Sequence, residues 1–101
     1  MPDKKSRAIE ILHFLIILDI QFKTSYEYYD DGSSGIIIEF GKSSEYALTI
    51  RDNTYNITCF NGAWAHDYTD YSEFKDRVLK SIHGYATTHK KTQVMHEKAK
   101  I

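Results

Sequence analysis

The chain begins with a segment whose apolar residues follow a helical period. Within Ala8–Ile20, the residues Ile9, Leu12 and Ile16 recur at the three- and four-residue spacing of one helix face. Further aliphatic and aromatic residues occupy its other sides, so the predicted helix is apolar almost all round. Such a helix is either covered on all sides or used for self-association. Because a small domain offers little to cover it, Ile9, Leu12 and Ile16 are candidate contacts of a homo-oligomer.

The pattern changes to a period of two after this helix. Four stretches either alternate between apolar and polar residues or consist of β-branched and aromatic ones, namely Ile20–Tyr28, Ile36–Phe40, Tyr46–Ile50 and Tyr55–Phe60. Both patterns are typical of β-strands. Short segments rich in Gly, Asp, Asn and Ser separate them, and such short connections favour antiparallel neighbours. The sequence therefore predicts a four-stranded antiparallel meander.

A second helix is predicted after Asp70. This residue can cap the helix, and Glu73 follows three residues later, as in a capping box. Apolar residues then recur at helical spacing, at Phe74, Val78, Ile82 and Tyr85. Gly84 predicts an end or a kink. The element order predicts an α+β fold for residues 1–86, with both helices on one sheet face, followed by a basic polar extension over residues 87–101.

The segment between the last predicted strand and this helix has two interpretations. Asn61-Gly62 is either a simple turn or the centre of a type I′ hairpin that adds a strand over Ala63–Tyr68. Trp64 is predicted to pack between the sheet and the second helix. Cys59 lies on the alternating side of its strand that faces the core, where a thiol is usually inert.

Charge divides the chain into an acidic body and a basic end. Residues 24–76 hold ten acidic and three basic residues, a net charge of −7, whereas residues 77–101 carry +5. Such segregation favours oriented binding to a charged partner, unless the two parts neutralise each other. The basic extension offers Lys90, Lys91, Lys98 and Lys100 to phosphates, but it lacks the aromatic and arginine residues of nucleic-acid readers. Nucleic acid is therefore the less favoured partner.

Catalytic and metal-binding patterns are weak in this sequence. A Cys59-His66-Asp67 arrangement contains the residue types of a nucleophilic site, but the predicted burial of Cys59 argues against it. His83, His89 and His96 are spaced six and seven residues apart, which does not place them on one helix face as metal ligands. We therefore expect a protein that is not an enzyme and has no metal or cofactor.

The location of the protein follows from its cysteine content and from its apolar segment. A single cysteine cannot form an internal disulfide and is typical of a reducing compartment. The segment Ala8–Ile20 is too short to cross a bilayer and is interrupted by charged residues. We expect a cytoplasmic protein that has no membrane contact.

Tyrosines and acids form the most informative surface pattern. The chain has eight tyrosines, and most lie among carboxylates, in Tyr26–Asp31 and in His66–Glu73. Tyrosine is enriched at protein interfaces, and nearby acids favour a basic partner. The candidate partner-binding residues are Tyr29, Asp30, Asp31, Asp67, Tyr68, Asp70, Tyr71 and Glu73. Tyr26 and Tyr28 share a strand face and are expected to pack on a helix.

One combination of these motifs resembles a known family. Ser44-Glu45-Tyr46, Asn61-Gly62, Trp64, Asp67-Tyr68, Asp70, Glu73-Phe74 and Ile82 stand in this order along the chain. The pattern is similar to small phage-encoded anti-CRISPR inhibitors of type II-A RNA-guided nucleases. The resemblance covers residues 36–82, and it implies a protein that occupies the DNA-reading groove of a nuclease with an acidic surface.

The chain also departs from that family. It has an additional strand, Tyr55–Phe60, a basic extension and a net charge of only −1. By the resemblance, Asp67, Asp70 and Glu73, together with Asp30 and Asp31, would carry the binding. The leading expectation is a small protein-binding module, a phage or mobile-element inhibitor that engages a basic partner such as a host nuclease. The alternatives are a self-assembling protein and a nucleic-acid-associated protein that uses its tail.

Overall fold

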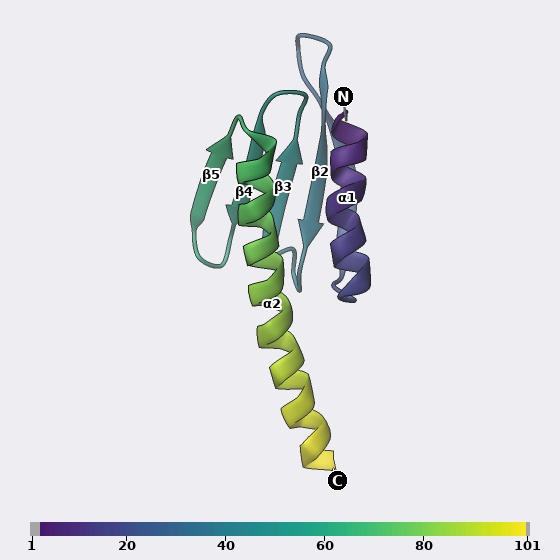
Figure 1. Ribbon diagram of the computed structural model, residues 1–101, viewed down its shortest axis with the longest axis vertical. Coiled ribbons are helices and arrows are strands. Elements are labelled where there is room, and N and C mark those ends of the chain that lie inside the picture. Colours follow the sequence, from purple (N-terminus) through teal and green to yellow (C-terminus); the bar gives the residue numbers. More distant parts are fainter. Residues whose placement is uncertain (1–2, 101) are drawn as a thin grey trace.

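Two helices cover one face of a single antiparallel sheet in the computed structural model (Figure 1). The elements follow the order α1 (Lys4–Ile17), β1 (Phe22–Tyr28), β2 (Ser34–Phe40), β3 (Tyr46–Ile50), β4 (Tyr55–Cys59), β5 (Trp64–Tyr68) and α2 (Tyr71–Lys100). The structure describes the backbone of residues 3–100 and the side chains of residues 3–88. The expected α+β class and helix–sheet–helix order are confirmed.

The sheet is a simple meander in which every strand pairs with its neighbours in sequence, in the order β1-β2-β3-β4-β5. It has five strands, one more than predicted, because the hairpin alternative for Asn61-Gly62 is the correct one. The turn is not type I′, however. Ala63 takes the positive φ of 55° instead of the Asn-Gly pair, and Cys59 pairs with Trp64 across the loop.

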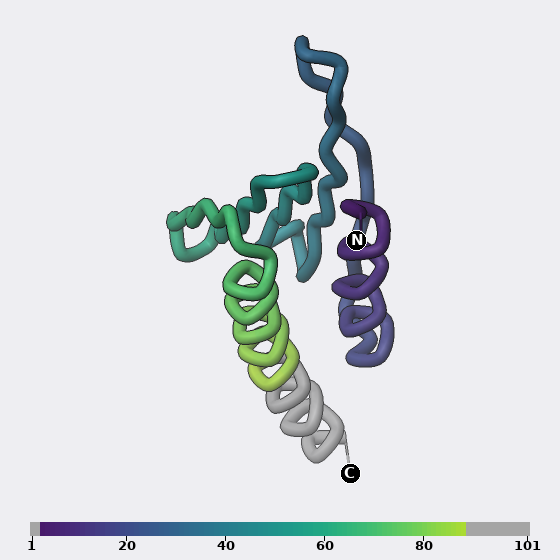
Figure 2. Tube along the Cα trace, turned by 45° about the horizontal axis from the view of Figure 1, so that its top comes forward, coloured from purple at the N-terminus to yellow at the C-terminus, as the bar shows by residue number. Residues whose placement is uncertain are grey.

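The core lies between the sheet and the two helices. The alternating residues Ile38, Leu48 and Ile57 are fully buried on one sheet face, and Ile11 and Phe74 cover them from α1 and α2. Figure 2 shows the helices side by side on this face. α1 packs mainly on β2 and β3, whereas α2 packs on β4 and β5. The opposite sheet face has no helix among the described residues.

The helix boundaries differ from the predicted ones. α1 begins at Lys4 because the Asp3 carboxylate accepts a hydrogen bond from the Ser6 backbone N–H at 2.9 Å. α2 begins after Asp70, whose carboxylate accepts from the Ser72 N–H at 3.0 Å, as expected of this cap. Gly84 does not end α2, because the helix continues to Lys100. The predicted basic extension lies outside the described side chains from position 89 onwards.

A close contact fixes the turn between β2 and β3 against α2. Gly41 has a φ of 94°, and a Cβ there would lie 3.0 Å from a ring carbon of Tyr85. The Tyr85 hydroxyl accepts a hydrogen bond of 2.7 Å from the Lys42 backbone N–H. Only glycine combines this backbone conformation with this approach. The β2–β3 turn is therefore held at the level of the end of the fourth turn of α2, where Tyr85 lies.

Two neighbouring isoleucines test which sheet face is the core. Ile38 is fully buried beneath the helices, whereas Ile37 is half-buried on the open face. Ile38→Ala should cost about 2–5 kcal/mol because it leaves a cavity. Ile37→Ala should cost about 1 kcal/mol, mostly through strand propensity. Urea unfolding of the two variants measures the difference, and equal costs would contradict the assignment of the core face.

Candidate functional site

The acidic tyrosine-rich surface predicted from the sequence is divided into two separate parts. In an antiparallel meander β1 and β5 both end at the same end of the sheet, but three strands lie between them. At about 4.8 Å per strand, the two chain segments are about 19 Å apart. Tyr29, Asp30 and Asp31 therefore form one group at the β1–β2 turn, and the remaining predicted residues form another at the β5–α2 corner.

The group at the β1–β2 turn is occupied by internal contacts. The Arg51 guanidinium lies 3.8 Å from the centre of the Tyr29 ring, and its Nη2 is 4.0 Å from an Asp31 oxygen. The Tyr29 hydroxyl donates a hydrogen bond to Glu27. Burial is the main cause that raises the pKa of Tyr29, and this hydrogen bond is the second. Hydrogen bonds from Ser33 lower the pKa of the Asp31 carboxyl. Arg51 thus neutralises part of this group and holds its tyrosine.

The β5–α2 corner contains a shallow hollow of about 590 Å³, lined by Thr54, Asp67, Tyr68, Thr69 and Glu73. Tyr68 is half-buried, and its ring centre lies 6.1 Å from that of Phe74. The Asp67 carboxylate accepts a hydrogen bond of 2.8 Å from the Asn56 amide. Within residues 3–88, no Lys or Arg forms a salt bridge with Asp67, Asp70 or Glu73. The negative charge of this corner therefore faces solvent.

Tyr71 belongs to the contact between the two helices and not to the outer rim of the corner. Its hydroxyl donates to Glu10 Oε1 at 3.0 Å, and the Arg7 guanidinium lies 4.7 Å from its ring centre. Burial is the main cause that raises its pKa well above the usual tyrosine range, and the Glu10 carboxylate adds to it. Lys75 Nζ lies 2.7 Å from the same Glu10 oxygen. These four side chains join α1 to α2.

A second surface is formed by α1 and the edge strand β1. The sequence predicts its α1 residues as oligomer contacts, but the expectation that Tyr26 and Tyr28 pack on a helix is wrong. Ile9 and Ile16 expose 64% and 63% of their surface, and Tyr26 and Tyr28 expose 55% and 79%. The two tyrosines stack on each other with ring centres 6.5 Å apart. Sequence alternation placed them correctly on the helix-facing side of β1. They remain largely uncovered because α1 packs mainly on β2 and β3, and it borders β1 only through the groove described below.

A groove connects these two exposed elements. Its volume is about 190 Å³, and it is lined by Lys5, Ala8, Ile9, Leu12, Thr24, Ser25, Tyr26 and Ile36. Leu12 lies half-buried at its wall and packs against the core. Of the three predicted oligomer contacts, Ile9 and Ile16 are therefore free surface, and Leu12 is shared between surface and core.

The single cysteine, Cys59, is part of the packed interior. Cys59 is buried, as predicted, and its Sγ accepts a hydrogen bond of 3.3 Å from the Gly62 backbone N–H. Trp64 packs between Tyr46 of the sheet and Arg77 of α2, whose guanidinium lies 4.3 Å from the indole ring centre. Both positions agree with the expectation of a packed corner.

The part of the chain that the structure describes offers neither a cluster of metal ligands nor a helix suited to a membrane. No group of three or more His, Cys, Asp or Glu side chains in that part of the chain could hold a metal ion. No helix in it combines the length and the apolar character that a membrane crossing requires.

The helix-to-helix contact predicts a pH-dependent contribution to stability. The hydrogen bond from Lys75 lowers the pKa of Glu10 below its usual 4.5. The stabilisation is therefore present above pH 4.5 and disappears as the pH falls through the lowered pKa. Because the pair is partly exposed, Glu10→Gln should cost about 0.5–1 kcal/mol at pH 7. Urea unfolding at pH 7 and pH 3 should show this difference shrinking at the lower pH, and a difference independent of pH would contradict the assignment.

The chain has no detectable similarity to known proteins at any of three levels, because it matches no protein-family model, no curated protein and no solved structure. The resemblance to anti-CRISPR inhibitors accordingly stays a prediction. The geometry and chemistry of the two surfaces are the basis on which a function is proposed.

Proposed function

We propose that this chain is a self-associating interaction protein, which acts by binding and not by catalysis, and that its contact surface runs over α1 and β1. One observation carries the proposal. Four large apolar or aromatic side chains, Ile9, Ile16, Tyr26 and Tyr28, are each more than half exposed on two adjacent elements. Large contiguous apolar patches on small proteins usually mark interaction sites.

The composition of this surface supports a protein partner. Aromatic residues are enriched in the buried centre of protein interfaces, because they bring a large contact area with little loss of side-chain freedom. Tyr26 and Tyr28 are already stacked, so part of their ordering cost is met before binding. The groove between Ile9 and Tyr26 is a depression in this surface that a side chain of the partner can fill.

The acidic corner supports a second candidate function, the binding of a basic partner. Asp67 and Glu73 line the same hollow, and neither has a cationic partner within residues 3–88. The Asp70 carboxylate caps α2 by accepting a hydrogen bond from the Ser72 N–H, so it is less available to bind a partner. A role as an inhibitor of a nuclease would use this corner. The tail-based alternative rests on lysines outside the described side chains.

Self-association is tested by sedimentation at a series of protein concentrations. Ile9→Lys should shift the chain towards monomer, because a charge then replaces an exposed apolar contact. Ile17→Lys is the matched control, because Ile17 is 63% exposed and lies about 80° round the helix from Ile9, away from the groove. A wild-type chain that stays monomeric at all concentrations would contradict the proposal.

The acidic corner is tested with a fluorescent oligolysine peptide as the probe. Asp67→Lys and Glu73→Lys should each weaken binding by about 1 kcal/mol, a factor of about five, because attraction becomes repulsion. Asp76→Lys makes the same charge change on an exposed position of α2 outside the hollow. Binding should also fall as salt rises. Equal effects of all three variants would reject the corner as the binding site.

A further inference from the structure

The outer edge of β1 is unpaired, and of the features that usually protect an edge it carries only two charged side chains, Lys23 and Glu27. β1 is the first strand in the sheet order, and its seven residues pair with β2 without interruption from Phe22 opposite Phe40 to Tyr28 opposite Ser34. It contains no Gly, no Pro and no bulge. Among the described residues, no other strand pairs with its outer side. Such an edge is a template for another strand.

The backbone groups of β1 that face outward can be assigned from its pairing with β2. The Tyr29 N–H donates to Ser33 O at 3.0 Å, and the Gly41 N–H donates to Gln21 O at 2.9 Å. Residues of an antiparallel strand alternate between groups directed at one neighbour and at the other. The odd-numbered residues therefore bond to β2, and Phe22, Thr24, Tyr26 and Tyr28 direct their N–H and C=O groups to the open edge.

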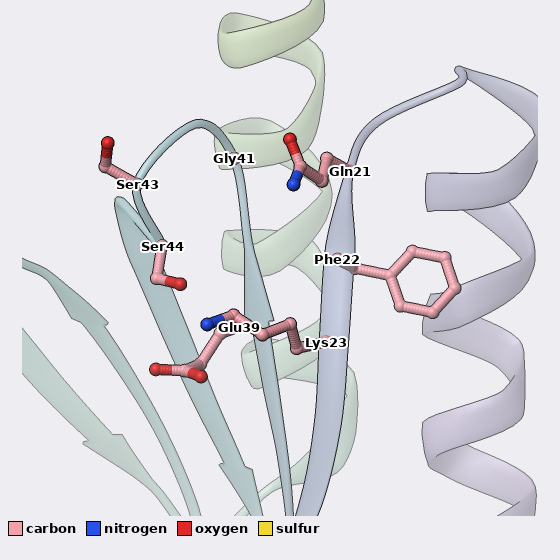
Figure 3. A pocket seen from close by; sticks show the side chains of 7 residues that line it. All are labelled: Gln21, Phe22, Lys23, Glu39, Gly41, Ser43 and Ser44. Carbon is pink, nitrogen blue, oxygen red and sulfur yellow. The ribbon is translucent and has the colours of Figure 1, made fainter.

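The charges on this strand are placed symmetrically about its midpoint. Ser25 is the central residue of Phe22–Tyr28, with Lys23 two positions before it and Glu27 two positions after it. In Figure 3, Lys23 extends over the same sheet face as Glu39, while Phe22 points away towards α1. Lys23 lies opposite Glu39 in the strand register, but no salt bridge joins the two. The Lys23 ammonium lies beside Glu39 in Figure 3 and would turn outward to meet a partner at the edge, a movement that no salt bridge opposes.

Resting on the self-association proposed above, we propose that a second copy of this chain adds to this edge, antiparallel, with Ser25 on the two-fold axis. This register places Thr24 opposite the second copy's Tyr26 as a hydrogen-bonded pair, which matches the outward groups of both residues. It also places Lys23 of each copy opposite Glu27 of the other, so the contact contains two such charge pairs. Both are non-hydrogen-bonded pairs, in which opposite side chains lie closest. The strand is thus complementary in charge to itself.

Neighbouring registers do not give this match. The alternation of backbone groups allows shifts of two residues only. One such shift places Lys23 opposite the second copy's Ser25, and the other places it opposite Tyr29. The register centred on Ser25 is the one that pairs all seven residues of the strand and both charges at once. Charge complementarity and strand length therefore select the same arrangement.

The helix layer fits this arrangement. With strands about 4.8 Å apart, the β2 strands of the two copies would lie about 14 Å apart, and each carries its α1 above it. Helices in direct contact have axes about 8–10 Å apart, so a gap of about 4–6 Å would remain between the two α1 helices for other side chains to fill. Ile9, Ile16 and Tyr26 border this space in each copy, and the groove places Ile9 and Leu12 at the level of Ser25. The exposed apolar surface would become the contact between the two helices.

Charge exchange tests the register. Lys23→Glu and Glu27→Lys alone should each raise the dimer dissociation constant about tenfold, because two attractive pairs become repulsive. The combined variant should restore it. Lys80→Glu, at an exposed position of α2, should leave it unchanged. If the wild type dimerises and the single variants do not weaken it, the register is overturned while self-association stands. If the wild type does not dimerise, both are overturned.

A disulfide at the axis provides a second measurement. Residues opposite each other in a close antiparallel pair have Cα atoms about 4.5 Å apart, within the range that a disulfide spans. Ser25→Cys should therefore yield a covalent dimer under mild oxidation, and the buried Cys59 should not compete. Ser72→Cys is the control at an exposed position of α2. Cross-linking of Ser25→Cys no faster than that of Ser72→Cys would overturn the axis position.

Discussion

The placement of two helices over different strands of one sheet face determines the remaining surface of this protein. α1 covers β2 and β3, and α2 covers β4 and β5, so the buried residues Ile38, Leu48 and Ile57 lie in the middle of the sheet. Burial of such side chains contributes about 1.5–3 kcal/mol each, which makes this layer the main source of stability. β1 lies at the edge of the sheet beside α1. Its Phe22 points towards α1 and packs against the core, whereas Tyr26 and Tyr28 on the same strand face are more than half exposed.

A second constraint is the polar contact that joins the helices. Arg7 packs against the rings of Tyr55 and Tyr71, and Glu10 accepts from both Tyr71 and Lys75. This network fixes the distance between α1 and α2, and hence how far α1 stands from β1. Tyr71 is thereby partly buried between the helices. Tyr71 is therefore a positioning residue of the fold, although its sequence neighbourhood resembles that of the exposed tyrosines.

Much of the fold could be predicted because local signals agree with the long-range packing. The alternation in Ile36–Phe40 and Tyr46–Ile50, and the cap at Asp70, each specify one element on their own. The fifth strand was ambiguous, because Trp64–Tyr68 has few apolar residues and is half-exposed on both faces. Gly84 suggested an end to α2, but an exposed glycine inside a helix costs only about 1 kcal/mol, which a long helix tolerates.

The candidate surfaces were harder to predict than the fold. Residue types indicated that tyrosines and acids matter, but not which of them are already engaged. Arg51 is distant in sequence from Tyr29 and Asp31, so the neutralisation of the β1–β2 turn depends on the β3–β4 turn reaching it. The exposure of Tyr26 and Tyr28 depends on where α1 lies, which hydrophobic periodicity alone does not determine.

The midpoint of β1 has a consequence for the size of any assembly. In a two-fold pairing centred on Ser25, both molecules use the outer edge of β1. Once two molecules have paired, neither has a free β1 edge left for a third. The free edges that remain belong to β5, a different strand that carries Asp67 instead of the Lys23–Glu27 pattern. Growth by this contact would stop at two molecules. An open edge of this kind would produce a closed particle and not a fibre.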